Sequence, residues 1–272
     1  MTGLSRETRL SLLAEQLSPR DLAVVRDVVR LRFVSAGQLA RLHFAAIQVA
    51  ATRTRRTTRT LARLRTHGLL RRLERRIGGV QGGSRGFIYM PSSEAVSLVR
   101  FLDGEGLGRP APRHEPGRTF VLHAIDCAEL YVRLVEGARE GELDLLEHQA
   151  EPAAWRQHPG AMGGVVWLRP DAFVALGVKE YEIRTFIEVD RGSEGSTTLR
   201  RKLSAYLDYY RSGREQQAHQ VFPRVYWQCP TPRRVRLLDD LIAELPETTQ
   251  ALFLTGLAEQ TIEALTGRRR TR

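Results

Sequence analysis

The segment from Ala51 to Arg76 constrains the fold more than any other part of the sequence. It contains ten arginines and a single acid, Glu74, which gives it a net charge of +9. Its apolar residues nevertheless recur at helical spacing, which predicts an amphipathic helix from Ala51 to His67 that ends at Gly68. Such a helix can pack only one face against a core, so its basic face must meet water or a polyanion.

The two faces of this predicted helix separate cleanly. At about 100° per residue from Arg53, Leu61 and Leu64 fall at about 80° and about 20°. Four arginines fall on the opposite side, between about 200° and about 300°; they are Arg55, Arg56, Arg59 and Arg63. This arrangement is typical of a DNA recognition helix, because guanidinium groups bind phosphates and read guanine edges in the major groove.

The neighbouring segments predict two shorter helices before the basic helix and a hairpin after it. Each short helix begins with a serine cap, over residues 18–30 and 35–42. The hairpin has strands at 69–76 and 87–90, joined by a glycine-rich turn at 78–83. This order resembles the winged helix-turn-helix family, which implies double-stranded DNA as the partner.

The predicted DNA-binding residues are all arginines of the third helix and of the hairpin. Those on the helix would contact bases and phosphates, and those on the hairpin would hold phosphates. They are Arg53, Arg55, Arg56, Arg59, Arg63, Arg71, Arg72, Arg75, Arg76 and Arg85. The whole chain carries a net +11 and its last five residues carry +4, so the sequence outside these two segments carries a net −2. The concentration of charge favours a polyanion partner over a uniformly solubilising surface.

Composition excludes several classes of protein. No apolar run approaches the roughly 20 residues that a membrane span needs, and the first residues lack a signal-peptide pattern. The two cysteines, Cys127 and Cys229, have neither disulfide-framework nor zinc-finger spacing. We therefore expect a cytoplasmic, nucleoid-associated protein with no membrane partner.

A segment rich in glycine, proline and charge divides the chain. It predicts an N-terminal extension at 1–17, a winged helix-turn-helix domain at 18–95, a linker at 96–118, a second domain at 119–267 and a basic tail at 268–272.

Periodicity in the second domain alternates between helix and strand. The predicted order is a helix at 119–138, strands at 143–151, 165–176 (broken at 169–171) and 181–190, a helix at 197–210, a strand at 221–228, a helix at 233–245, and a last strand at 251–254 before a terminal helix. This order predicts a mixed α/β domain.

Pro170-Asp171, followed 17 to 19 residues later by Glu188-Val189-Asp190, resembles the motif of the PD-(D/E)XK nuclease superfamily. The resemblance implies an αβββαβ restriction-endonuclease-like core, in which Asp171, Glu188 and Asp190 bind Mg²⁺ or Mn²⁺ and a lysine helps to activate water. Strand alternation independently predicts that Glu188 and Asp190 share one face. Carboxylate oxygens are the ligands that these hard cations prefer.

The sequence departs from the superfamily motif at one position, because Asp190 stands where the motif has lysine. Lys202, on the following predicted helix, is the candidate replacement. It lies beside an apolar stripe that begins at Leu199, from which its side chain can reach the sheet edge. The predicted catalytic set is therefore Asp171, Glu188, Asp190 and Lys202. The alternative is that the acids are solvated or salt-bridged at strand ends and that Lys202 is a surface lysine.

Taken whole, the chain resembles the replication-relaxation family. The features that carry the resemblance are the winged helix, the linker, His123 near the start of a predicted helix, Arg169-Pro170-Asp171, Glu188-Val189-Asp190-Arg191-Gly192 and Lys202-Leu203-Ser204-Ala205-Tyr206. The resemblance implies a plasmid or other mobile element and a relation to mobilisation relaxases.

Two functions follow as hypotheses. One is a metal-dependent DNA endonuclease, or nickase, that acts in replication, relaxation or mobilisation. The other is a catalytically inactive winged-helix regulator whose nuclease-like domain serves homodimer formation or partner docking. The three acids and Lys202 favour the first, and Asp190 in place of lysine favours the second.

Overall fold

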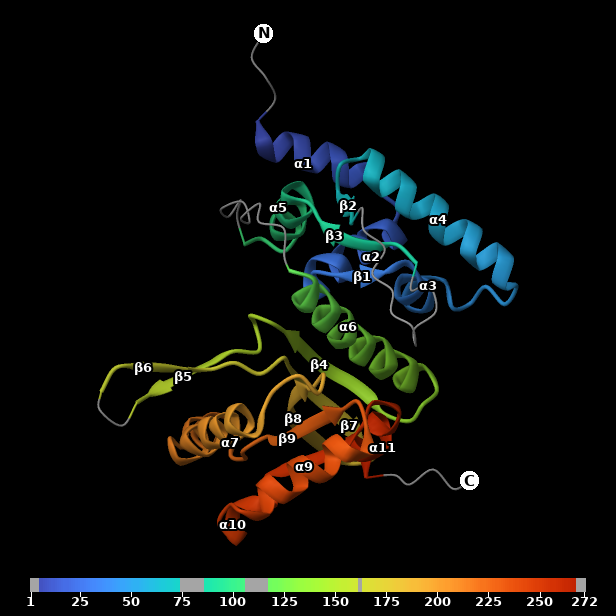
Figure 1. The fold of residues 1–272 in the computed structure, drawn as a ribbon. Helices are drawn as coiled ribbons and strands as arrows, with labels where there is room; N and C mark the ends of the chain where they lie inside the picture. Colours follow the sequence, from blue (N-terminus) through green and yellow to red (C-terminus); the bar gives the residue numbers. More distant parts are fainter. Residues whose placement is uncertain (1–4, 74–85, 106–116, 161–162, 268–272) are drawn as a thin grey trace. The chain divides into compact units, whose positions relative to one another are not determined.

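The structure is a computed structural model that describes residues 5–73, 86–105, 117–160 and 163–267 (Figure 1). The chain divides into two compact units, Met1–Val132 and Arg133–Arg272, and the boundary falls inside helix α6 (Arg118–Arg139). Each unit combines helices with a sheet, so the chain is mixed α/β, as the sequence predicts. The domain limits expected from the sequence, which begin the second domain at residue 119, stay a prediction.

The described residues of the first unit form five helices ahead of α6 and one small antiparallel sheet of order β1-β3-β2. Its elements are α1 (Arg6–Glu15), α2 (Pro19–Leu31), β1 (Val34–Ser35), α3 (Ala36–Phe44), α4 (Ala50–Thr66), β2 (Leu70–Arg72), β3 (Ile88–Pro91) and α5 (Ser93–Leu102). The three helices expected from the sequence correspond to α2, α3 and α4. The sequence did not predict α1, and α5 covers residues that it assigned partly to the linker.

Local chemistry explains where these helices begin and end. Ser18 and Asp21 form a capping box at the start of α2, and Ser35 and Gln38 form another at the start of α3. After α4 the backbone turns at Gly68, whose φ of +69° only glycine adopts without strain.

The second unit is built on a five-stranded mixed sheet of order β10-β9-β8-β7-β4. Its elements are β4 (Asp144–Ala150), β5 (Arg156–Pro159), β6 (Val165–Leu168), β7 (Ala172–Val178), β8 (Tyr181–Val189), α7 (Ser196–Arg211), α8 (Arg214–His219), β9 (Arg224–Cys229), α9 (Pro232–Ala243), α10 (Glu247–Gln250), β10 (Phe253–Leu257), the short 3₁₀ helix Ala258–Gln260 and α11 (Thr261–Thr266). Strands β4, β7 and β8 are antiparallel, whereas β8, β9 and β10 are parallel.

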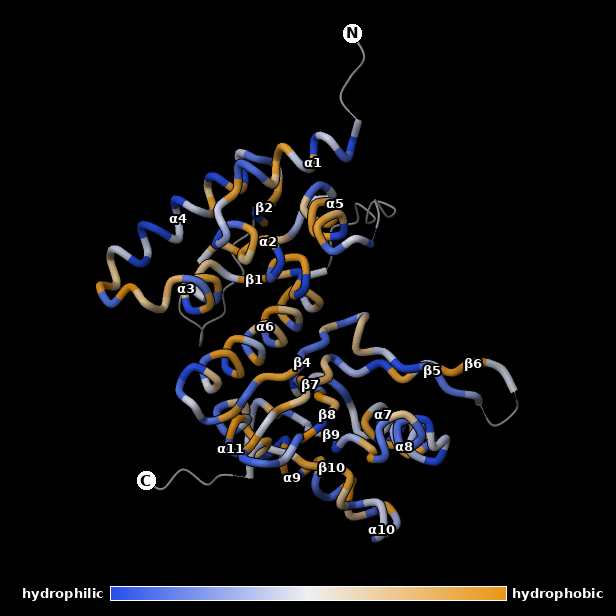
Figure 2. Tube along the Cα trace, turned by 180° about the vertical axis from the view of Figure 1, so that it is seen from behind, coloured by the Kyte–Doolittle hydropathy of each residue, from blue (hydrophilic) through white to orange (hydrophobic). Residues whose placement is uncertain are grey.

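The helices α7 and α9 cover one face of this sheet and bury its core. Leu199 and Leu203 of α7 pack with Phe186 of β8, Trp227 of β9 and Leu238 of α9, all 1% exposed or less. The tube in Figure 2 is predominantly hydrophobic along β7, whereas β8 and β9 mix hydrophobic with hydrophilic residues. The connection β8–α7–β9 joins two parallel strands through a helix, which brings α7 over the end of β8.

Two details of the sheet differ from the sequence expectation. The apolar residues 165–176 were expected to form one broken strand, but β6 and β7 belong to different sheets. β6 instead pairs with β5 in a separate two-stranded hairpin, with Trp167 opposite Gln157. The sequence did not predict β5, because residues 156–159 lack an alternating apolar pattern.

Among the helices that the structure describes, none combines the length and the apolar composition that a membrane span needs.

Candidate functional site

Helix α4 directs a row of arginines to solvent. Arg55, Arg56 and Arg59 are exposed, whereas Leu61 and Leu64 on the other face are fully buried. Within the described part of the chain, none of these three arginines forms a salt bridge. The outer face of α4 therefore carries uncompensated positive charge.

Arg63 and Arg53 lie differently from the other predicted arginines of α4. The Nη2 atom of Arg63 donates to both carboxylate oxygens of Asp21, at 2.5 and 2.7 Å. Asp21 is buried and also caps α2 through Ser18. Burial raises the pKa of Asp21, but hydrogen bonds from Arg63 and Ser18 outweigh burial and hold it below its usual value. Arg63 therefore joins α4 to the start of α2, and Arg53 is only half-buried at the first turns of α4.

The two described arginines of the hairpin, Arg71 and Arg72, are both exposed on β2. The guanidinium of Arg72 lies 4.1 Å from the centre of the Phe87 ring, a cation–π contact that holds it against the sheet. The other predicted hairpin positions lie outside the described residues: Arg75, Arg76, Arg85 and the turn at 78–83.

A buried carboxylate forms the centre of the candidate site in the second unit. Glu188, near the end of β8, is 3% exposed. Its Oε1 accepts a hydrogen bond from the Tyr206 hydroxyl at 2.6 Å, and its Oε2 accepts one from the Lys202 ammonium at 3.0 Å. Both donors come from α7, one turn apart on the helix.

Lys202 lies between two carboxylates. Its Nζ is 3.0 Å from Oε2 of Glu188 and 3.1 Å from Oε2 of Glu194, which belongs to the loop before α7. Lys202 therefore contacts Glu188 near the end of the central strand β8, and its catalytic role stays a prediction. Glu194 was not expected from the sequence.

Asp171 and Asp190 each have a partner that fixes the carboxylate. Oδ2 of Asp171, just ahead of β7, accepts the backbone N–H of Val189 at 2.7 Å. Asp190 follows the last residue of β8 and is bound by the guanidinium of Arg234, whose Nη2 lies 3.0 Å from Oδ1 and whose Nε donates to Oδ2. Both Asp190 oxygens are therefore engaged by one arginine of α9.

Burial and neighbouring charges shift the proton affinity of this centre. Burial, followed by the nearby Asp171 carboxylate, raises the pKa of Glu188 to about 7, although Lys202 and Tyr206 stabilise its anion. Burial lowers the pKa of Lys202, but the carboxylates of Glu188, Asp171 and Glu194 outweigh burial and raise it. Lys202 is therefore charged at neutral pH, whereas Glu188 gains or loses its proton close to neutral pH.

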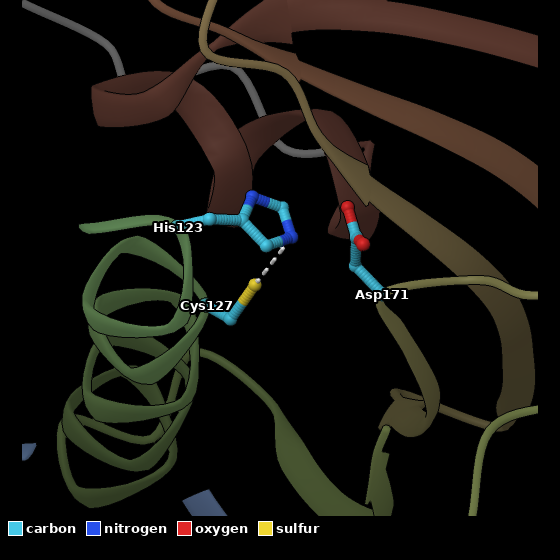
Figure 3. Close-up of side chains that lie close together, drawn as sticks. All are labelled: His123, Cys127 and Asp171. Atoms are coloured by element: carbon cyan, nitrogen blue, oxygen red, sulfur yellow. Dashed lines mark hydrogen bonds between the residues drawn. The ribbon is translucent and has the colours of Figure 1, made fainter. Parts of the chain in front are cut away.

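The side chains of His123, Cys127 and Glu129 on α6 belong to the first unit. Cys127 Sγ is 3.6 Å from Nε2 of His123, one helical turn away (Figure 3). Glu129 binds Arg41 through Oε1 at 2.6 Å and Gln38 through Oε2 at 3.1 Å. Asp171, also drawn in Figure 3, belongs to the second unit.

Sequence reasoning missed Tyr206, Glu194 and Arg234 as members of the acid centre. Tyr206 had a usable signal, because it stands four residues after Lys202 and therefore on the same helix face. Glu194 and Arg234 had none, since each reaches the centre from a loop or helix whose position only the folded sheet determines.

The chain was compared with known proteins in three ways. No curated protein and no solved structure is significantly similar to it. The family model described as "Replication-relaxation" matches residues 25–225, which includes α4 as well as Asp171, Glu188 and Lys202. The match covers most of the 272 residues and extends into both compact units. The chain therefore belongs to the replication-relaxation family.

Proposed function

We propose that the chain is a DNA-binding protein of a plasmid or other mobile element, and that it acts in the replication, relaxation or mobilisation of that element's DNA. Family membership supports the biological setting. The exposed arginine face of α4 is the observation that carries the proposal of DNA binding.

In this proposal the first unit is a winged helix-turn-helix and α4 is its recognition helix. The order of α2, α3 and α4, followed by the antiparallel pair β2 and β3, supports the assignment. Arg55, Arg56 and Arg59 would contact double-stranded DNA, because a guanidinium binds both phosphate oxygens and guanine edges. Arg71 and Arg72 on β2 would hold phosphates beside the groove. Arg63 contributes mainly by fixing α4 on Asp21.

Binding of a fluorescent DNA duplex to the full chain tests this proposal. Replacing Arg55, Arg56 and Arg59 together with Gln should weaken binding at least tenfold, because three phosphate-neutralising charges are lost. The matched control replaces Arg200, Arg201 and Arg211 of α7 with Gln, which removes the same exposed charge elsewhere. Equal affinities for the two triple variants would overturn the assignment of α4.

A second candidate function, metal-dependent DNA nicking, is favoured by the contact between Lys202 and Glu188. We propose that the second unit is a PD-(D/E)XK-like domain in which Lys202 takes the place of the motif lysine. Asp171 and Glu188 are close enough to interact electrostatically and offer the oxygen ligands that Mg²⁺ or Mn²⁺ prefers. When bound, such a cation would polarise a phosphodiester and lower the pKa of a water molecule. Asp190 fits less well, because Arg234 engages both of its oxygens.

The competing proposal is a catalytically inactive domain that serves homodimer formation or partner docking. The observation that favours it is internal neutralisation, because the ammonium of Lys202 lies between two carboxylates and the guanidinium of Arg234 binds a third. In that case the protein's own cations take the place of a metal ion.

Two measurements separate these proposals. The first is nicking of a supercoiled plasmid that carries the encoding element, with Mg²⁺ or Mn²⁺ and with EDTA. The second is the melting temperature of the full chain with added Mn²⁺, which rises only if the folded state binds the ion.

Asp171→Asn keeps an acceptor for the Val189 N–H but removes the charge, so it should abolish the Mn²⁺ effect. The exposed Glu244→Gln variant is the control and should retain it. The absence of both nicking and a Mn²⁺ shift in the unmodified chain would favour the inactive domain.

A further inference from the structure

The separate two-stranded hairpin formed by β5 and β6 exposes several apolar side chains to solvent. It extends beyond the five-stranded sheet of the second unit (Figures 1 and 2). Val165, Val166 and Trp167 are 66%, 43% and 45% exposed. Residues 165 and 166 point to opposite faces of the hairpin, so both faces present apolar surface. Exposure of this kind is typical of a binding site.

Trp155 organises the exposed aromatic surface at the base of this hairpin. The rings of Trp155 and Trp167 meet edge to face, with their centres 6.2 Å apart. The guanidinium of Arg169, also exposed, lies 4.9 Å from the centre of the Trp155 ring. The exposed indole of Trp167 and the exposed guanidinium of Arg169 therefore both contact Trp155, which holds them in position to contact a ligand.

The charge of the hairpin identifies the kind of ligand. From Pro152 to Pro170 the sequence contains Arg156, His158 and Arg169 but no aspartate or glutamate. Of these three, Arg169 is exposed, whereas His158 is buried and Arg156 is paired with Glu215. The exposed guanidinium of Arg169 and the exposed indole of Trp167 complement a polyanion with π faces, because bases stack on indole rings while arginines balance phosphates. Bases of duplex DNA already stack on one another, so only unpaired bases can use such a ring.

The hairpin is rooted firmly on the rest of the unit. Nε of Arg156 donates to the buried Glu215 at 3.1 Å, and Nη2 donates to Gln149 at 2.9 Å. His158, 4% exposed, packs against the Tyr209 ring of α7. Because these contacts fix β5, little conformational entropy should be lost when a ligand binds.

The end of the hairpin leads directly to the acid centre. β6 ends at Leu168, and the chain then passes through Arg169 and Pro170 to Asp171. A strand of nucleic acid that follows β6 towards Arg169 would thus be directed to the carboxylate beside Glu188.

We propose that the β5–β6 hairpin is a binding site for single-stranded DNA, in which unpaired bases stack on Trp167 and the phosphate backbone contacts Arg169. The inference rests on the proposed role of the chain in DNA processing. It adds a second nucleic-acid site, distinct from the duplex-binding face of α4.

Quenching of tryptophan fluorescence by an oligothymidine of about ten nucleotides tests the proposal on the full chain. Trp227 is fully buried, so quenching reports mainly on the two indoles of the hairpin. Trp167→Leu keeps an apolar side chain but removes the π face, and should weaken oligothymidine binding roughly tenfold, measured with a labelled oligonucleotide. Trp167→Phe should restore most of the affinity. Tyr181→Leu, which changes a 74% exposed aromatic residue outside the hairpin, is the control and should bind like the unmodified chain.

The same variants distinguish this proposal from the assignment of α4. Trp167→Leu should leave duplex affinity unchanged, and the triple Gln variant at Arg55, Arg56 and Arg59 should retain quenching by oligothymidine. Unchanged oligothymidine affinity in Trp167→Leu overturns the hairpin proposal whatever α4 does. Dissociation of a dimer by Trp167→Leu in sedimentation experiments, without any loss of oligothymidine binding, would instead identify the hairpin as a contact between two copies of the chain. Unchanged duplex affinity in the triple Gln variant overturns only the proposed role of α4.

Discussion

At the scale of single residues, Glu188 is held by an unusual balance of opposing effects. Burial and the neighbouring Asp171 favour its protonated form, whereas the Lys202 ammonium and the Tyr206 hydroxyl favour its anion. The result is an acid with a pKa of about 7, against 4.5 without these surroundings. A group of this kind can hold or release a proton near neutral pH, which suits either a catalytic site or a stability switch.

The raised pKa of Glu188 predicts a pH dependence of stability. Between pH 4.5 and about 7 the unfolded chain has lost this proton, but the folded chain still holds it. The free energy of unfolding contributed by Glu188 should therefore fall as pH rises through this window, by at most about 1.4 kcal/mol per pH unit. Denaturant unfolding at several pH values should show a flatter profile for Glu188→Gln than for the unmodified chain. Identical profiles would contradict the raised pKa.

The contact between Lys202 and the buried Glu188 predicts that removal of the ammonium lowers the stability of the protein. Lys202→Met keeps the apolar stem but leaves the buried Glu188 with Tyr206 as its remaining donor. Since Lys202 is about one-third exposed, we expect a loss of about 1–2 kcal/mol at neutral pH. Arg200→Met breaks an exposed pair with Glu244, which solvent screens, and should change stability far less than Lys202→Met. A cost for Lys202→Met as small as that of the Arg200 control would show that Lys202 behaves as a surface lysine.

At the scale of elements, the position of α4 depends on the start of α2. The carboxylate of Asp21 caps α2 together with Ser18 and receives the guanidinium of Arg63 from α4. One buried acid therefore both begins a helix and fixes the basic helix beside it.

This connection predicts that Arg63 differs in function from its neighbours on α4. Arg63→Met should lower stability, because it leaves the buried Asp21 without its cation. Since Arg63 itself is half exposed, solvent screens the pair and we expect a loss of about 1–2 kcal/mol. Arg55→Met should change stability by under about 0.5 kcal/mol. Thermal or denaturant unfolding of the two variants gives the comparison. Equal stabilities would remove the structural role that we assign to Arg63.

Elements with strong local signals were predictable, and elements that depend on distant partners were not. Serine caps and helical spacing predicted α2, α3 and α4 within a few residues. The β5–β6 hairpin of the second unit was not predictable. The sequence of Val165–Leu168 resembles a core strand, and only its pairing with β5 places it outside the main sheet. Strand alternation also assigned Asp190 to the face of Glu188, but β8 ends at Val189, and Arg234, 44 residues further on, determines where Asp190 binds.

At the scale of the whole molecule, the distribution of charge is the strongest feature that the sequence and the fold share. The net +9 between Ala51 and Arg76 corresponds largely to α4 and β2, whose exposed arginines form the candidate duplex-binding surface. The sequence predicted this surface because charge and helical periodicity are local properties. The acid centre was only partly predictable, because Glu194 and Tyr206 reach Glu188 and Lys202 through the packing of α7 on the sheet.

The most direct test of the central claim is the salt dependence of duplex binding by the full chain. The logarithm of the association constant should fall steeply with the logarithm of salt concentration, because bound arginines release counterions from the phosphates. The triple variant with Gln at Arg55, Arg56 and Arg59 should reduce the magnitude of this slope by about 3. The α7 control variant at Arg200, Arg201 and Arg211 should leave the slope unchanged. A slope unaffected by the α4 substitutions would contradict the claim that this helix binds DNA.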